Sequence, residues 1–148
     1  MSGALVAGLD AGLAYNMFPY MEEGRIKAEN AWSLRRLEYF PTVTAWLKDN
    51  LFDNTASVQF NHRVLAVSTA TLVSALYFSS RKLTQYLPRS TRIARHVLMG
   101  SVVIQVSLGI STLLYLVPVG LGAAHQAGAV AVLSSVLWLL HSLSRVRL

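Results

Sequence analysis

The stretch that decides the fold is residues 97–140, VLMGSVVIQVSLGISTLLYLVPVGLGAAHQAGAVAVLSSVLWLL, which contain no Asp, Glu, Lys or Arg. One bilayer span needs about 20 apolar residues, so the run is long enough for two. We divide it into spans over about 93–117 and 121–143, with a turn at 117–121. A soluble helical bundle would need a charged face on each helix, and this run has none.

A third span precedes this run, over about 56–79, and reads ASVQFNHRVLAVSTATLVSALYFS. Its residues 64–80 are also uncharged. Ser, Thr, Gly and Ala recur among the large apolar residues of all three spans, and small residues let helices approach closely in lipid. The predicted fold class is therefore all-α, a polytopic membrane helical bundle that packs helix on helix.

The composition agrees with a membrane protein of one domain, residues 1–148. The chain is 53% hydrophobic and 14% charged, whereas soluble domains average about 25% charged residues. It has no cysteine, which excludes disulfides, covalent c-type haem attachment, iron–sulfur ligation and thiolate zinc sites. The net charge of +6 is distributed unevenly along the chain, so it indicates membrane topology and no nucleic-acid partner.

The amino-terminal residues 1–18 are apolar but too short for a full span, and Asp10 lies in their middle. We interpret them as the last part of a truncated amino-terminal helix. The Gly8-x-x-x-Gly12 spacing predicts a helix-packing face on it.

The only polar stretch is residues 22–54, which we interpret as an outer loop with one or two short interfacial helices. Four aromatic residues of this loop suit the headgroup level of a bilayer: Trp32, Tyr39, Phe40 and Trp46. A simple solvated loop is the alternative. Asp53 or Asn54 is the expected N-cap of the span that follows.

The basic residues predict the orientation. Seven of them lie near loop 80–92 and in the carboxy-terminal tail without acidic neighbours: Arg81, Lys82, Arg89, Arg92, Arg95, Arg145 and Arg147. In the 22–54 loop five basic residues are offset by six acidic ones. The positive-inside rule therefore places loop 80–92 and the tail on the cytoplasmic or matrix side. The first and third spans then run in the same direction.

Two histidines lie at matching depth in these parallel spans. His62 is about six residues into the first span and His125 about four into the third, roughly 6–9 Å below the outer edge at the rise of an α-helix. This geometry suits a haem held between two axial imidazoles. Two interfacial histidines that bond to backbone or to Ser and Thr are the alternative.

Two further residues are haem-binding candidates. The guanidinium of Arg63 matches a haem propionate with paired hydrogen bonds, although it could instead snorkel to the headgroups. Gly128, one turn after His125, would let a flat macrocycle approach the backbone, or would serve ordinary small-residue packing. Gln59 and Gln126 could orient a ligand or bond between helices.

His96 and His141 form a second pair, at the inner ends of the second and third spans. A dihaem cytochrome would have such a second layer. Arg95 directly precedes His96, and Arg145 follows four residues after His141. An interfacial, solvated role is therefore the simpler interpretation.

Four ordered blocks carry a family resemblance: GALVAGLDAGLAYNMFP (3–19), NTASVQFNHRVLA (54–66), LGISTLLYLVP (108–118) and AAHQAG (123–128). They resemble the carboxy-terminal half of haem A synthases of the mitochondrial and alphaproteobacterial type. That family has eight helices in two similar halves, and it oxidises a methyl group of haem o to the formyl group of haem A for cytochrome c oxidase.

The resemblance implies a haem b held by His62 and His125, which match the histidine pair of the family's carboxy-terminal half. His96 and His141 match no family histidine. The family's amino-terminal half, with its own histidine pair and a catalytic glutamate, has no counterpart in the chain, and the outer loop lacks the usual Trp-Ile-Pro stretch. Whether the chain is by itself an oxidoreductase is therefore left open, and no catalytic residue is assigned.

The expected function is that of the haem b-binding half of a haem A synthase. A haem-binding or structural membrane subunit without synthase activity is the alternative. The implied partners are haem, membrane lipid, a separate or missing amino-terminal half and an electron donor. The implied location is the mitochondrial inner membrane or, alternatively, the bacterial plasma membrane.

Overall fold

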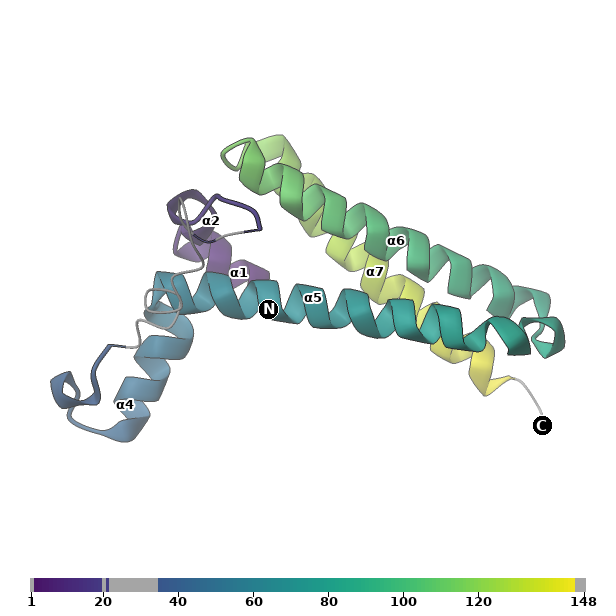
Figure 1. Cartoon of the computed structure of the whole chain (residues 1–148), viewed down its shortest axis with the longest axis horizontal. Coiled ribbons are helices and arrows are strands. Elements are labelled where there is room, and N and C mark those ends of the chain that lie inside the picture. The colour runs from purple at the N-terminus through teal and green to yellow at the C-terminus, as the bar shows by residue number, and fades with distance from the viewer. Residues whose placement is uncertain (1, 20, 22–34, 146–148) are drawn as a thin grey trace. The chain divides into compact units, whose positions relative to one another are not determined.

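The computed structural model describes residues 2–19, 21 and 35–145, and this part of the chain is helical without strands (Figure 1). Three long helices dominate it: α5 (Thr55–Ser79), α6 (Arg89–Leu114) and α7 (Val119–Ser144). Each is long and apolar enough to cross a membrane. The predicted all-α polytopic fold and its three spans are confirmed, and the part of the outer loop at 22–34 lies outside the described residues.

Six shorter elements complete the described chain: α1 (Ser2–Gly8), α2 (Ala11–Ala14), the 3-10 turn η1 (Leu37–Tyr39), α4 (Val43–Lys48), the π-helical turn η2 (Asp49–Asp53) and the 3-10 segment η3 (Ser80–Tyr86). The chain divides into two compact units. The first comprises residues 1–65 and 112–118, and the second comprises 66–111 and 119–148.

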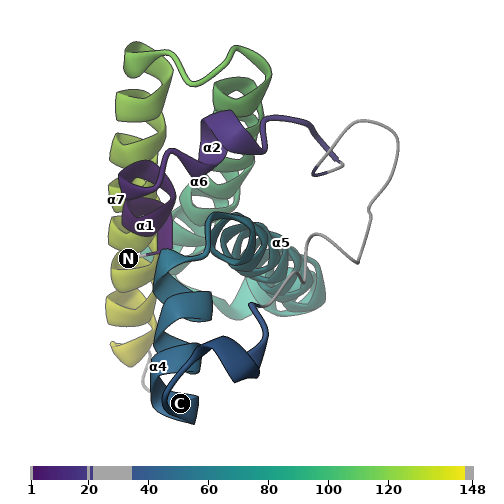
Figure 2. The same ribbon diagram turned by 90° about the vertical axis from the view of Figure 1, so that its left-hand side faces the viewer.

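In the second unit, α6 and α7 lie side by side (Figures 1 and 2). Their contact is apolar and centred on buried Ala94, Leu98, Val102 and Leu139, and Val132 and Val136 of α7 and Ala70 and Val73 of α5 pack against this cluster. Two polar contacts fix the register. Thr91 Oγ1 donates to the carbonyl of Ser142 over 3.5 Å, and the hydroxyls of Ser101 and Ser135 are 3.3 Å apart. The helices are therefore antiparallel.

A buried cation closes the turn between α5 and α6. Arg95 is only 6% exposed, and its Nη1 donates to the Tyr77 carbonyl and to Ser80 Oγ, each over 3.1 Å. Its guanidinium carbon lies 4.6 Å from the centroid of the Tyr77 ring, in a cation–π contact. The end of α5 thus meets the start of α6, so α5 and α7 run in the same direction, as predicted.

In the first unit the amino-terminal segment is broken into two helices. Asp10 adopts a left-handed conformation with φ 49°, which an α-helix cannot continue. The prediction of one helical face through Gly8 and Gly12 is therefore wrong. A Cβ at Gly8 would meet nothing within 4 Å, whereas one at Gly12 would lie 3.2 Å from Cγ2 of Val117.

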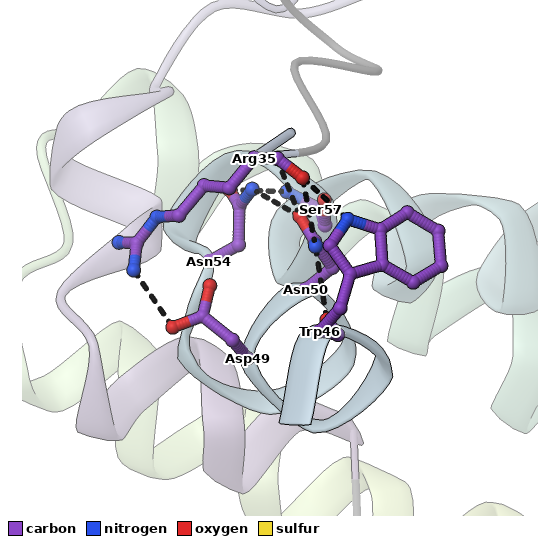
Figure 3. Close-up of polar contacts among 6 residues, drawn as sticks. All are labelled: Arg35, Trp46, Asp49, Asn50, Asn54 and Ser57. Carbon is purple, nitrogen blue, oxygen red and sulfur yellow. Dashed lines mark hydrogen bonds and ion pairs between the residues drawn. The ribbon is translucent and has the colours of Figure 1, made fainter. Parts of the chain in front are cut away.

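A polar network leads into α5 in the first unit (Figure 3). Asn54 accepts a hydrogen bond from the Ser57 amide over 3.3 Å, which confirms it as the N-cap. Its own amide donates to Asn50 Oδ1 over 3.1 Å. Asn50 is 2% exposed, and its Oδ1 also accepts from the backbone amide of Arg35 over 2.8 Å. The side-chain amides of Asn50 and Asn54 thus join Arg35 and η2 to the first turn of α5.

Candidate functional site

His62 lies in the second turn of α5, where α1 covers one edge of its ring. The hydroxyl of Ser2 is 3.0 Å from His62 Nδ1 in a hydrogen bond. A Cβ placed on Gly3 would lie 3.5 Å from His62 Cε1, which is ordinary van der Waals distance. The imidazole is therefore oriented by a hydroxyl and bordered by a backbone that has room for a methyl group.

Arg63, the next residue, binds backbone oxygens in the segment after α2. Its Nη2 donates to the carbonyls of Tyr15 and Met17 over 2.8 and 2.7 Å, and its Nη1 donates to Pro19 over 3.5 Å. A planar cation with several fixed donors is well suited to gathering carbonyls in this way. The structure thus gives Arg63 a defined positioning role, and its contact with a haem propionate stays a prediction.

Gln59 lies one turn before Arg63 and reaches the same segment. Its side chain is 1% exposed, and its Nε2 donates to the Tyr15 carbonyl over 3.3 Å. Of the two roles left open by the sequence, the structure shows the bond to a neighbouring segment. The side-chain amide of Gln59 and the guanidinium of Arg63 therefore hold residues 15–19 against α5.

His125 lies in the second turn of α7, where its ring packs on the backbone of α6. A Cβ built on Gly109 would be 2.9 Å from His125 Cε1 and 3.5 Å from both ring nitrogens. Real Cβ atoms do not approach this closely, so only glycine leaves room for the imidazole. In addition, Gln105 Nε2 donates to the His125 carbonyl over 3.0 Å. The helix α6 thus holds both the ring and the backbone of this histidine.

Gly128 lies one turn after His125 and faces the same glutamine. A Cβ at Gly128 would collide with Gln105 Oε1 and come within 3.5 Å of Leu108 Cδ1. The sequence predicted that a macrocycle could approach the backbone at Gly128. In this structure the side chain of Gln105 in α6 fills the space beside Gly128. Contact of Gly128 with a macrocycle stays a prediction.

The other histidines have different surroundings. His96 is exposed, and its Nδ1 is 3.0 Å from the hydroxyl of Tyr77. His141 is exposed in the last turn of α7. The ring of His96 stands edge-on to that of Tyr77 with centroids 5.5 Å apart, and both histidines lie near basic residues of the second unit.

Sequence reasoning missed Gln105 and Gly109. They lie four residues apart on one face of α6, and both contact α7 around His125. A glutamine and a glycine one turn apart within an uncharged span were the available signal. Which helix that face would meet is not encoded in the spacing.

The chemistry of the donors fits haem. A metal-ligating imidazole usually has its second nitrogen hydrogen-bonded, which fixes the tautomer and the ring plane. The bond between Ser2 Oγ and His62 Nδ1 orients the ring, and ligation of iron by His62 stays a prediction. Neutral imidazole nitrogens suit haem iron without any cysteine. The ring of His125 is held by close packing on Gly109, which also fixes its plane.

The profile of the cytochrome oxidase assembly proteins, COX15-CtaA, matches residues 1–137. Bovine "Heme A synthase COX15" is 48% identical over 146 residues, which are 99% of this chain and 32% of the relative. A "Heme A synthase" of Nitrosospira multiformis is 43% identical, over 98% of this chain and 37% of the relative. A "Heme A synthase-mitochondrial ferredoxin fusion protein" of Schizosaccharomyces pombe is 39% identical, over 93% of this chain and 22% of the relative. No solved structure matches.

The chain spans about a third of the length of the curated relatives it matches. Mitochondrial and bacterial relatives and three membrane-length helices agree with a multi-pass protein of the mitochondrial inner membrane or a bacterial membrane. Haem binding is implied at the level of the family. On the extent of these matches, the chain belongs to the cytochrome oxidase assembly protein family COX15-CtaA, with the haem A synthases.

Proposed function

We propose that this chain acts in haem A biosynthesis as the haem b-binding half of a haem A synthase. In this role it supports oxidation of the haem o methyl group to formyl and thereby the assembly of cytochrome c oxidase. The observation that carries the proposal is the 48% identity to bovine haem A synthase over 99% of the chain. The environments of the two histidines support it independently.

In this proposal His62 and His125 are the axial ligands of the haem iron. Ser2 holds the His62 ring by its Nδ1, and Gly109 leaves space for the His125 ring. Each imidazole is thus oriented before any ligand arrives, which reduces the ordering cost of binding. Bound haem would supply one-electron chemistry at its iron.

Arg63 and Gly128 would serve the periphery of the same haem. Arg63 places a permanent cation at the head of α5, where a propionate carboxylate would find a planar donor. Gly128 keeps the α7 backbone free of a Cβ beside Gln105. In this proposal Arg63 also positions residues 15–19 through their carbonyls.

The partners follow from what the relatives contain. They are about three times as long as this chain, so we propose that an amino-terminal half with its own histidine pair completes the enzyme. The fission yeast relative is named as a fusion with a mitochondrial ferredoxin. A small iron–sulfur protein is therefore the proposed electron donor.

The test is an absorbance spectrum of the full chain purified in detergent with haem b added. The expected result is a Soret band of a low-spin bis-histidine haem that is largely lost in both His62→Ala and His125→Ala. The matched controls are His96→Ala and His141→Ala, which should keep the band. Loss in neither test variant, or an equal loss in all four, would overturn the ligand assignment.

A haem-binding subunit without synthase activity is the second candidate, because the residues proposed at His62 and His125 account for haem binding and not for oxidation of a methyl group. Conversion of haem o to haem A by membranes that contain this chain with a co-expressed amino-terminal half distinguishes the two. Product formation that stops in His62→Ala supports the synthase role. A stable haem-loaded complex without turnover supports the second candidate.

A further inference from the structure

The helical segment 43–53, formed by α4 and η2, exposes a row of large apolar side chains. Val43, Leu47 and Leu51 recur every four residues and are 57%, 43% and 47% exposed. Phe52, beside Leu51, is 49% exposed. Residues four apart lie on one face of a helix, so Val43, Leu47 and Leu51 form an apolar row that Phe52 flanks at its end; these four side chains are named the 43–52 row below.

A different face of the same segment is tied down by polar contacts (Figure 3). Trp46 Nε1 donates to the carbonyl of Arg35. Asp49 Oδ1 accepts from Arg35 Nη1 over 2.7 Å, and Asn50 Nδ2 donates to the Trp46 carbonyl over 3.0 Å. Because these contacts fix the rotation of the segment about its axis, the exposure of the 43–52 row is a property of the fold.

The segment adjoins the end of a membrane span. Asn54 alone separates η2 from α5, and it caps α5 while bonding to Asn50. Figure 1 shows α4 turned steeply away from the axis of the adjoining α5. A short helix set at a steep angle to a span suits the plane of the membrane surface.

The polar residues beside the row fit a lipid surface. Thr44 and Lys48 are exposed and lie on the neighbouring row, which Phe52 continues four residues after Lys48. A lysine next to buried apolar side chains reaches the phosphate level by snorkelling. The indole of Trp46 suits the headgroup layer. An apolar face bordered by lysine and tryptophan is the pattern of a helix that lies in the interface plane.

We propose that segment 43–53 is a membrane-surface anchor, which inserts the 43–52 row into the acyl boundary of the bilayer. The occupant of this face is lipid. Through Asn50 and Asn54 the anchor is joined rigidly to the first turn of α5, so it sets the depth and rotation of the helix that carries His62. This goes beyond haem binding, and it stands whether or not the chain is part of a synthase.

The experiment uses site-directed spin labels in the full chain, which has no native cysteine to remove. Labels at Leu47→Cys and Leu51→Cys probe the row, and labels at Thr44→Cys and Lys48→Cys on the same helix are the matched controls. The protein is placed in nanodiscs of palmitoyl-oleoyl phosphatidylcholine. Power saturation then compares the accessibility of each label to oxygen and to a polar nickel chelate.

The expected result is that oxygen exceeds the chelate at Leu47 and Leu51, with the order reversed at Thr44 and Lys48. High chelate access at all four sites would mean a solvated helix and would overturn the proposal. Low access to both reagents at Leu47 and Leu51 would mean that a protein surface covers the row, in a second copy or another subunit, and would also overturn it.

The polar tether is tested by a second variant, Asn50→Ala, combined with the Leu47 label. We expect the label to become more mobile and its difference in access between oxygen and chelate to shrink towards that at Thr44. An unchanged spectrum would show that the contacts of Asn50 do not orient the row, and would remove the depth-setting part of the proposal.

Discussion

His62 and His125 differ in what holds the imidazole in place. His62 is oriented by a hydrogen bond to Ser2, and the nearby Gly3 could accept a methyl group without strain. His125 is wedged against the backbone at Gly109, where a methyl group has no room. One ring is positioned by an adjustable polar contact and the other by close packing.

The difference shows which of the two histidine environments tolerates change. A hydroxyl can be lost or replaced by water at a modest cost, because the folded state gives up one hydrogen bond. A Cβ on Gly109 would overlap the imidazole of His125, so the ring would have to leave its place before a methyl group could fit. The position of the His125 ring therefore depends on Gly109, a residue without a functional side chain.

The largest expected effect is from Gly109→Ala, which should lower the free energy of unfolding by about 2 kcal/mol through overpacking. The new Cβ would push the His125 ring out of position, so bound haem should decrease as well. Denaturation in mixed micelles and the Soret band measure the two effects. The control is Gly100→Ala on the same helix, where a Cβ meets nothing within 4 Å; equal losses in the two variants would contradict the packing argument.

The next effect is expected from Arg63→Met, which removes the donors to three carbonyls between Tyr15 and Pro19. Hydrogen bonds from a charged group contribute about 1.5–3 kcal/mol; because Arg63 is partly exposed, we expect a loss near the lower end. Hydrogen exchange should rise in residues 11–17. Arg63→Lys, which keeps the charge but loses the fork of donors, should recover only part of this protection. Full recovery would show that charge alone matters.

A smaller effect, about 1 kcal/mol, is expected from Gly128→Ala, because the atom it meets is the end of a flexible glutamine side chain. The Gln105 side chain can rotate away from the new Cβ, and it then loses its hydrogen bond to the His125 carbonyl. A double-mutant cycle with Gln105→Ala measures the coupling. If the two changes are additive, Gln105 is not what Gly128 accommodates.

The smallest effect on stability, about 0.5 kcal/mol, is expected from Ser2→Ala, which removes one partly buried hydrogen bond. If His62 binds iron, the electron paramagnetic resonance g-values of the haem should still shift, since Ser2 orients the ring. Gly3→Ala is the matched control and should leave both properties unchanged. Unaltered g-values in Ser2→Ala would deny Ser2 an orienting role.

Much of the fold followed from the sequence, because uncharged runs of membrane length leave a chain few alternatives to helices. The predicted spans agree with α5, α6 and α7 to within a few residues at each end. The N-cap was predicted as Asp53 or Asn54, and the structure shows Asn54. The amino-terminal segment was not, since the break at Asp10 depends on a left-handed backbone conformation that an aspartate adopts only in some contexts.

The candidate site was predicted only in part. His62, Arg63 and His125 stand out because polar groups are rare in spans. Their partners Ser2, Gln105 and Gly109 do not, since serine, glutamine and glycine also serve ordinary helix packing. The carbonyls that Arg63 binds belong to a segment more than forty residues away in the sequence, so no local pattern indicates them.

By itself the sequence determined that this protein lies in a membrane and where its long helices are. It also identified the polar residues within the spans, whose burial in lipid costs free energy and therefore suggests a function. The physical reason is that backbone N–H and C=O groups in lipid must be hydrogen-bonded within each helix, a local requirement that a run of apolar residues indicates directly. The tertiary structure alone decided which glycine faces which ring and which carbonyls meet the guanidinium. Those contacts join distant segments, and their geometry depends on helix rotation and register that composition does not specify.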